Sequence, residues 1–230
     1  MTEELPLGTE LDWTPVERPA RAPLAGEHVV LRPVDAADDL EALYAASHPP
    51  QGDPAMWTYL PYGPFQGPDA MREYLAWAER SEDPLFFALV PLPGERPAGL
   101  ASYLRIEPEF GVIEIGHIWF GAPLRRTTAA TEAIYLLGRR AFDELGYRRL
   151  EWKCNALNAA SRRAAERFGF RFEGVFRNHM VVKGRNRDSA WYAITAEEWP
   201  AVRRAYEAWL DPEDLGPGVR QKRSLRDFLP

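Results

Sequence analysis

The spacing of apolar residues changes several times along the chain and predicts an alternation of helices and strands. Met71, Tyr74, Leu75 and Ala78 recur at helical spacing after Pro68, a residue suited to the first turn of a helix. Alternating or continuous apolar runs instead predict strands. By these criteria we predict helices over about 36–47, 68–80, 129–145, 159–168 and 196–209, and strands over about 28–32, 85–90, 98–106, 112–120 and 150–154.

Two further patterns indicate how the strands pair. Short turn-like segments separate the three strands between residues 85 and 120, which is typical of an antiparallel meander. Segments 172–183 and 188–195 can pair as a hairpin around a turn at 183–187. Thr195 and Glu198 have the spacing of a capping box for the last helix. The chain therefore predicts a mixed α/β fold with a largely antiparallel sheet.

The distribution of prolines and polar residues divides the chain into three parts. Residues 1–26 contain four prolines and little periodicity, and we interpret them as an extended arm anchored by Trp13. Residues 27–210 form the predicted domain, and residues 211–230 form a polar C-terminal tail. The arm and the tail are candidate contacts for a homo-oligomer.

The segment before Pro68 is rich in proline, glycine and aromatic residues. It carries Trp57, Tyr59, Tyr62 and Phe65. Long loops in compact domains are usually functional or disordered, so this segment predicts a binding loop. A hydrophobic lid on the core is the alternative interpretation of the same residues.

Cysteine content and hydropathy indicate the cellular compartment in which the protein is expected. Cys154 is the one cysteine of the chain, which excludes an intramolecular disulfide and a zinc site built from several cysteines. The longest strongly apolar run, Leu85–Val90, is too short to span a bilayer, and the acidic residues 1–4 do not resemble a signal peptide. We therefore expect a cytoplasmic protein without a membrane partner and without a bound metal.

The net charge is −6, and the charged residues are unevenly distributed along the chain. Residues 1–120 hold 7 basic and 20 acidic side chains, whereas residues 121–190 hold 15 basic and 7 acidic ones. A basic region of this kind favours a polyanionic ligand, although scattered solvated arginines would give the same count. The acidic remainder and the absence of any nucleic-acid-binding motif favour a small phosphorylated ligand over nucleic acid.

The basic region contains a strand that leads into the start of a helix, over residues 119–133. The first N–H groups of a helix lack intrahelical partners and sit at the positive end of its dipole, so such a junction suits an anion. Small residues and the arginines Arg125 and Arg126 reinforce that expectation. The junction has neither a Walker motif nor the glycine pattern of a dinucleotide fold.

Three segments, in order, carry a resemblance to a known family. Arg125-x-x-Thr128-x-Ala130 runs into Thr131-Glu132-Ala133. Glu114-Ile115-Gly116-His117 precedes it, and Asn158-x-x-Ser161 with Phe168-Gly169-Phe170 follows. Over about residues 27–196 the sequence resembles the GCN5-related N-acetyltransferase (GNAT) superfamily, and within it the RimJ/RimL-type branch.

The resemblance implies a three-layer α/β fold and a coenzyme. The central sheet would be twisted, mostly antiparallel and splayed where acyl-CoA inserts, with helices on both sides. The pyrophosphate of acetyl-CoA, or of another acyl-CoA such as succinyl-CoA, would bind backbone N–H groups of residues 126–130. Thr128 departs from the family's usual glycine, and its Cβ limits both close approach and a positive φ. The residues so assigned to the cofactor are Ile118, Trp119, Phe120, Arg125, Arg126, Thr127, Thr128, Ala129, Ala130, Asn158 and Ser161.

The resemblance also implies catalytic roles for three residues. Transfer of an acyl group to an amine needs a base for the ammonium and an acid for the departing thiolate. Glu114 matches the family's strand glutamate and is the expected base, and Ser161 is the expected acid near the thiolate. His117 is a further candidate base, but its parity in a regular strand points it away from Glu114 unless a bulge re-aims it. Capping of a helix is the alternative role for Asn158.

The expected function is acetyl transfer from acetyl-CoA to a primary amine, either a small molecule or a protein N-terminus. The acidic first half of the domain favours a cationic acceptor. A catalytically degenerate acyl-CoA-binding or interaction module is the alternative, motivated by Thr128 and the proline-rich arm. A thiol relay through Cys154, His117 and Asn155 is a weaker alternative, because Cys154 alternates with core residues.

Overall fold

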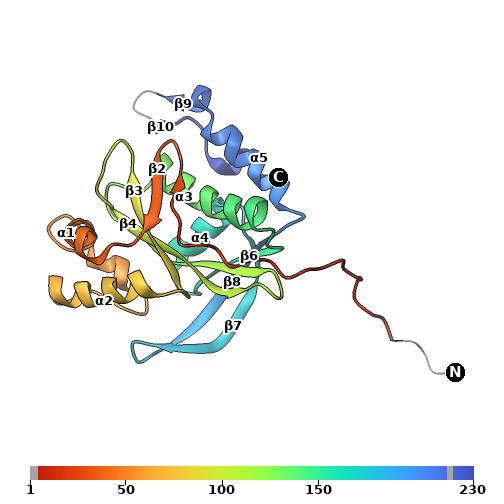
Figure 1. Ribbon diagram of the computed structural model, residues 1–230, viewed down its shortest axis with the longest axis horizontal. Coiled ribbons are helices and arrows are strands. Elements are labelled where there is room, and N and C mark those ends of the chain that lie inside the picture. Colours follow the sequence, from red (N-terminus) through yellow and green to blue (C-terminus); the bar gives the residue numbers. More distant parts are fainter. Residues whose placement is uncertain (1–4, 217–219) are drawn as a thin grey trace.

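The computed structural model describes residues 5–216 and 220–230. Its centre is an eight-stranded sheet with strand order β1-β2-β3-β4-β5-β6-β8-β7, covered by helices (Figure 1). The sheet strands are β1 (Leu24–Ala25), β2 (Val29–Pro33), β3 (Leu85–Pro91), β4 (Gly99–Glu107), β5 (Val112–Phe120), β6 (Arg149–Asn155), β7 (Arg171–Val182) and β8 (Arg185–Thr195). The helices are α1 (Ala36–Ser47), η1 (Pro54–Trp57), α2 (Pro68–Arg80), α3 (Thr128–Arg139), η2 (Arg140–Glu144), α4 (Ala159–Arg167), α5 (Trp199–Leu210), η3 (Pro212–Asp214) and η4 (Leu225–Asp227). A short pair, β9 (Leu215–Gly216) and β10 (Arg220–Gln221), forms a separate ladder.

One pair of strands departs from the antiparallel pattern of the sheet. β5 and β6 are parallel, and their ladder runs only from Val112 opposite Arg149 to Ile115 opposite Trp152. Both strands continue beyond that point, β5 to Phe120 and β6 to Asn155. The sheet is therefore split between its two central strands, as the expected splayed α/β fold requires.

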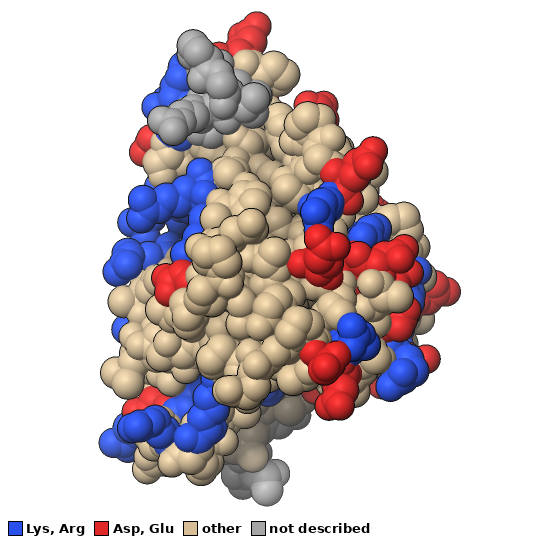
Figure 2. Space-filling view, turned by 90° about the vertical axis from the view of Figure 1, so that its left-hand side faces the viewer, with Lys and Arg blue, Asp and Glu red and all other residues tan. Residues whose placement is uncertain are grey.

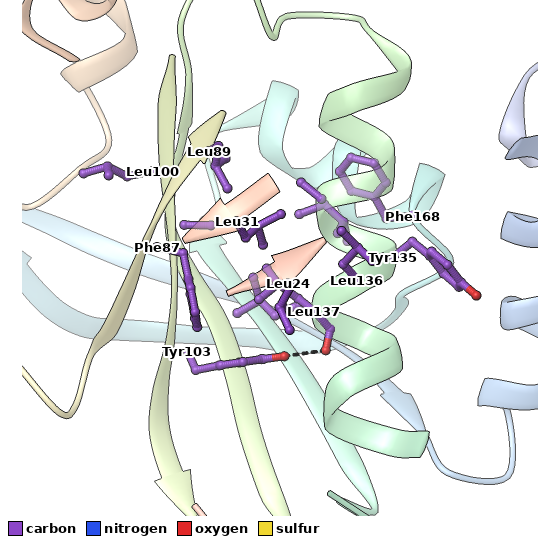
Figure 3. Packing of buried hydrophobic residues seen from close by; sticks show 14 of the residues in the cluster. Leu24, Leu31, Phe87, Leu89, Leu100, Tyr103, Tyr135, Leu136, Leu137 and Phe168 are labelled. Atoms are coloured by element: carbon purple, nitrogen blue, oxygen red, sulfur yellow. Dashed lines mark hydrogen bonds between the residues drawn. The ribbon is translucent and has the colours of Figure 1, made fainter. Parts of the chain in front are cut away.

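Helices cover both faces of the sheet. α1 and α2 pack together on one side, and α3, α4 and α5 lie on the other (Figure 1). Leu31, Phe87 and Leu137 are fully buried between the sheet and α3 (Figure 3). The Tyr103 hydroxyl donates a 2.5 Å hydrogen bond to the carbonyl of Leu137, so the one polar atom of that buried ring is satisfied.

Two helix boundaries differ from the prediction. The helix predicted over 129–145 is α-helical only to Arg139 and continues as a π-turn, which brings Phe142 onto Trp199 with ring centroids 5.0 Å apart. The last helix begins at Trp199 rather than near 196, because the Glu198 carboxylate binds the N–H of Thr195 and the chain turns before the helix starts.

The β7–β8 hairpin has a tighter turn than the predicted 183–187. Lys183 and Gly184 alone connect the strands, with φ angles of 50° and 70°. Two left-handed residues give a turn whose twist matches that of the strands, so pairing resumes at once at Arg185.

Both terminal segments contact the domain. The Trp13 indole donates to the carbonyl of Glu109 at 2.8 Å, and Leu24–Ala25 pairs with β2 as a strand of the sheet. Near the other end, Leu225 is fully buried, and the Trp209 indole donates to the carbonyl of Arg223 at 3.0 Å. In the part of the chain that the structure describes, no helix is both long and apolar enough to cross a bilayer.

Charged side chains segregate on the face that carries α1 and α2. Lys and Arg gather along one edge, and most Asp and Glu lie on the opposite half with a broad uncharged strip between them (Figure 2). This separation agrees with the uneven distribution of charge along the sequence.

Candidate active site

A cavity of about 500 Å³ opens where β5 and β6 separate. Its wall combines both split strands with α4, β4, the β7–β8 hairpin and the segment from Ala55 to Pro61. Eight of the predicted site residues line it, namely Glu114, His117, Ile118, Trp119, Phe120, Arg125, Asn158 and Ser161. Strand alternation places Trp152 and Cys154 on the α4 side and Lys153 on the opposite side, so the cavity reaches both faces of the sheet.

A β-bulge brings His117 to the same cavity as Glu114. Leu100 pairs with Trp119 and Ser102 pairs with Gly116, so one residue of β4 opposes two residues of β5. His117 has a φ of 51°, in the left-handed region. The strand is not regular here, so the parity argument does not apply and the bulge named as its exception is the one that the structure shows.

Glu114 is a buried carboxylate with two cationic neighbours. Its side chain is 5% exposed, and its Oε2 lies 3.2 Å from the Lys153 Nζ and 3.1 Å from the Arg105 Nε. Burial raises the pKa of Glu114, and the charges of Lys153 and Arg105 oppose that rise. Its carboxylate is thus buried beside two cations and has a stronger affinity for a proton than a solvated glutamate.

Lys153 is the centre of this charged group. Its Nζ lies 2.7 Å from the Oε2 of Glu151 and 3.6 Å from the ring centroid of Trp191. The side chain is only 4% exposed, so two carboxylates and an aromatic face replace the water that it loses.

His117 is held as a neutral imidazole. Its Nδ1 lies 3.1 Å from the Tyr62 hydroxyl, and the two rings stack with their planes 7° apart. Burial, followed by the charges of Arg105 and Arg187, lowers the pKa of His117 to about 4. The imidazole therefore carries no charge at neutral pH.

The α4 side of the cavity presents hydroxyl, amide and thiol groups. The Ser161 Oγ accepts a 3.1 Å hydrogen bond from the Trp152 indole. Asn158 is the N-cap of α4, and its Oδ1 accepts from the N–H of Ser161, which confirms the capping role. Burial raises the pKa of the Cys154 thiol, which disfavours the thiolate that a relay through Cys154 would require.

The central part of the wall is aromatic. Trp119 is buried against Trp57 with ring centroids 5.6 Å apart, and its indole nitrogen has no hydrogen-bond partner within the described structure. Buried polar atoms without partners are rare in folded proteins, and Trp119 is a residue of the cavity wall.

The predicted anion loop lies next to the cavity rather than in its wall. Arg125 lines the cavity and donates from Nε to the carbonyl of Phe120 at 3.0 Å, whereas residues 126–130 do not line it. Thr127 caps α3 through a 3.2 Å bond from the N–H of Ala130. Thr128 is already the first residue of α3, and the left-handed backbone of this loop occurs at Arg126, with a φ of 60°. The backbone therefore needs no glycine at position 128.

Some functional residues were not predicted from sequence. Arg105, Lys153 and Arg187 line the cavity, yet nothing in their local sequence marks them. The aromatic segment before Pro68 was predicted to be either a binding loop or a hydrophobic lid on the core. Tyr59 lines the cavity, as in a binding loop, and Trp57 is fully buried, as in a lid.

Glu132, in the motif at the start of α3, has a structural contact. Its carboxylate accepts from the backbone N–H groups of Glu27, His28 and Val29 at 2.7–3.0 Å. A side chain on Gly26 would begin 2.5 Å from that carboxylate, so a larger residue there would displace the Glu132 side chain. The motif therefore also attaches α3 to the start of β2.

No cluster of three or more His, Cys, Asp or Glu side chains suited to a metal ion occurs within residues 5–216 and 220–230.

Comparisons with known proteins identify the family. The acetyltransferase (GNAT) domain family matches residues 28–171. The chain is 46% identical to a GCN5-related N-acetyltransferase from Brucella melitensis, with a TM-score of 0.91 over 94% of this chain and 98% of that one. It is 40% identical to a probable acetyltransferase of the GNAT family from Chromobacterium violaceum, with a TM-score of 0.78 over 87% and 100%. No curated protein matches the chain.

A more distant structure shares the fold alone. The microcin C7 self-immunity acetyltransferase MccE, in complex with acetyl-CoA and AMP, is 21% identical with a TM-score of 0.64, over 74% of this chain and 93% of that one. The family match spans more than half of the chain, and the two closer structures exceed 30% identity over most of it. The chain therefore belongs to the GNAT family of acetyltransferases and is an enzyme that transfers acetyl groups.

Proposed function

We propose that this enzyme transfers the acetyl group of acetyl-CoA to a primary amine bound in the cavity between β5 and β6. The observation that carries the proposal is the cavity itself, which passes through the split sheet and has Glu114 and His117 toward one end and Ser161 toward the other. A donor and an acceptor that approach from opposite faces of the sheet would meet inside this cavity.

The residues present fit an acyl-CoA. The separated strand β5 offers backbone groups beyond Ile115, the Trp119 N–H lacks a partner, and Arg125 stands beside the start of α3. When bound, acetyl-CoA supplies an activated thioester. Phosphate groups would be held by Arg125, Arg126 and the first N–H groups of α3, since the positive end of a helix dipole favours anions. The fold of MccE, crystallised with acetyl-CoA, supports this placement.

Glu114 is the proposed general base. A protonated amine must lose a proton before it can attack a carbonyl carbon, and a carboxylate with a raised pKa is better matched to that task than a solvated one. The proton would pass to Glu114, directly or through one water. His117 would act as a neutral hydrogen-bond partner oriented by Tyr62, because its pKa of about 4 makes it a weak base.

Ser161 is the proposed acid. Its Oγ accepts from the Trp152 indole, so its hydroxyl hydrogen is not used in that bond; this hydrogen, which can also reach the Cys154 thiol, would be donated to the departing thiolate. Transfer would replace the carbon–sulfur bond of the thioester by a carbon–nitrogen bond to the amine, and Ser161 would supply the proton that the thiolate takes.

The closer assignment to the RimJ/RimL-type branch is part of the proposal and rests on the three motifs quoted above. The position of Glu114, His117 and Ser161 on one cavity supports it, because these residues come from two of those motifs.

A turnover assay tests the proposal. The purified enzyme would be incubated with acetyl-CoA and a panel of primary amines, with release of free thiol and the mass of the product as readouts. We expect amide-forming transfer to at least one amine, and loss of that transfer in Glu114→Gln. Binding of acetyl-CoA without transfer to any amine would instead support the binding-module alternative.

A further inference from the structure

We infer that the acceptor is a small amine that also carries a carboxylate or phosphate group, and that Arg187 with Arg105 binds this anionic group. The inference rests on the proposed function and assigns a substrate class to it.

The end of the cavity that contains Glu114 has an excess of positive charge. Arg105, Lys153 and Arg187 line it, and Glu114 is the one carboxylate among the cavity-lining residues. Glu114 is already engaged by Lys153 and Arg105. Among the acidic residues that the structure describes between positions 5 and 120, Glu114 alone reaches the cavity wall, so those residues do not give the cavity the charge of a cation site.

Within the described structure, Arg187 is the cavity-lining cation that makes no direct ion pair, and Glu114 is the nearby carboxylate that acts on its charge. Its Nε is buried and has no hydrogen-bond partner, and it forms no ion pair with any residue of the described ranges 5–216 and 220–230. Burial lowers the pKa of Arg187; Cys154 and the charge of Glu114 oppose this fall, and the charge of Arg105 adds to it. Arg187 is half-buried, and a buried guanidinium nitrogen without a partner is costly, so an anionic ligand that reached this guanidinium would reduce that cost.

Arg105 is aimed at the cavity by a second bulge. Leu104 pairs with Glu114 and Glu107 with Val112, so two residues of β4 oppose one of β5, and Arg105 has a φ of 46°. The Asp83 carboxylate fixes this conformation, because it accepts from the N–H groups of Arg105 and Ile106 at 2.9 and 3.1 Å. Left-handed backbone at a non-glycine residue is unfavourable and is typically retained at functional sites.

These two arginines are separate from the arginines of the proposed cofactor loop. Arg105 lies on β4 and Arg187 on β8, next to the face on which Lys153 contacts Trp191. Arg125 and Arg126 belong to the loop before α3, beyond the other end of β5. The arginines at the Glu114 end thus face the acceptor rather than the coenzyme phosphates.

The surroundings also favour a small acceptor. The Lys183 Nζ at the hairpin tip donates to the carbonyls of Trp57 and Gly63 at 2.8 and 2.6 Å, and the Tyr59 hydroxyl donates to the carbonyl of Leu157 at 3.3 Å. These contacts attach the hairpin tip to the chain around residues 57–63 and attach Tyr59 to Leu157, so both segments are held beside the cavity. A guanidinium binds carboxylate or phosphate through two parallel hydrogen bonds, which would orient the amine of a short ligand toward Glu114.

Matched pairs of acceptors test this inference. The panel contains three aminocarboxylates, namely glycine, β-alanine and 4-aminobutyrate, and each is compared with its own amide. Phosphoethanolamine is compared with ethanolamine. Spermidine is included as a cationic amine. Turnover is measured as kcat/KM in the wild type, Arg187→Gln, Arg187→Lys and Arg185→Gln. Arg185 is an exposed residue of the same hairpin that does not line the cavity, so its variant is the control for loss of one charge. Calorimetric titration of the coenzyme-free protein with the same amines gives a readout independent of turnover.

We expect the anionic member of at least one pair to exceed its neutral partner about ten- to hundredfold, as charged hydrogen bonds typically contribute. Arg187→Gln should remove most of this preference, Arg187→Lys should retain part of it, and Arg185→Gln should leave it intact. The aminocarboxylate and phosphoethanolamine pairs distinguish the two anionic groups.

Three results would overturn the inference: a preference for neutral amines or spermidine, a preference that Arg187→Gln leaves unchanged, or no binding and no turnover of any anionic amine by protein that binds acetyl-CoA. Failure to bind acetyl-CoA would contradict the proposed function instead.

Discussion

Glu114 combines burial with two cationic contacts, and this combination defines its chemistry at the scale of single residues. Burial raises its pKa, and the charges of Lys153 and Arg105 oppose that rise. A base must be deprotonated to act, so activity should fall as the pH decreases toward the pKa of Glu114. Because that pKa is raised above its usual value of 4.5, the fall should occur at a higher pH than for a solvated glutamate.

Replacement of Glu114 by Gln should lower kcat by about 10²- to 10⁴-fold, the usual contribution of general base catalysis, and leave the affinity for acetyl-CoA unchanged. Glu114→Asp, which keeps the carboxylate, should retain part of the activity. Thermal melting checks that both variants fold, since Lys153 still has Glu151 as a partner. A Glu114→Gln enzyme with wild-type kcat would exclude Glu114 as the base.

His117 should make the fold sensitive to acid. Its pKa of about 4 in the folded state lies below the ordinary value of 6.5, so the unfolded chain binds the proton first as the pH falls. The free energy of unfolding should therefore decrease between about pH 6.5 and pH 4. In His117→Asn, which tolerates left-handed backbone, the decrease should be smaller. Urea titrations at pH 7 and pH 5 measure the difference, and an equal decrease in both proteins would contradict the assigned burial of His117.

Bulges and side-chain attachments position the site at the scale of elements. The bulges at His117 and Arg105 each turn a polar side chain of a central strand into the cavity. Glu132 of α3 binds three N–H groups at the start of β2, and Lys183 attaches the hairpin tip to the segment around Trp57. Each contact joins segments that lie far apart in the sequence.

Glu132→Gln should destabilise the protein by about 2 kcal/mol, because hydrogen bonds to a buried charged acceptor are worth more than neutral ones. Glu144→Gln is the matched control, since Glu144 makes only a 3.8 Å exposed ion pair with Arg139. Denaturant unfolding of the two variants compares them. Equal, small losses would show that Glu132 does not hold the start of β2.

Lys183→Asn should free the hairpin tip while keeping the turn, because Asn-Gly is a preferred two-residue turn and Asn is too short to reach both carbonyls. We expect the KM for the amine to rise several-fold with little change in the dissociation constant of acetyl-CoA. An unchanged KM would mean that this attachment does not shape the acceptor end of the cavity.

At the scale of the whole molecule, periodicity predicted most elements and the motifs predicted which strand and helices form the site. α1 and α2 have the predicted bounds, and eight predicted residues share one cavity. Bulges and long-range strand pairing determine the positions of His117, Arg105 and Arg187. Neither feature could be predicted from the local pattern of apolar and polar residues. The preference for a cationic acceptor, expected from summed charge, does not follow from the charges that line the cavity.

The most direct measurement of the central claim is calorimetric titration of the protein with acetyl-CoA, succinyl-CoA and free CoA. The same titration is made on Arg125→Ala/Arg126→Ala and on Ala164→Trp, which places a large side chain in the cavity wall on α4. We predict micromolar binding of acetyl-CoA that the double arginine variant weakens about tenfold or more and that Ala164→Trp abolishes. Absence of binding in the wild type, or binding that both variants leave unchanged, would contradict the assignment of this cavity to the coenzyme.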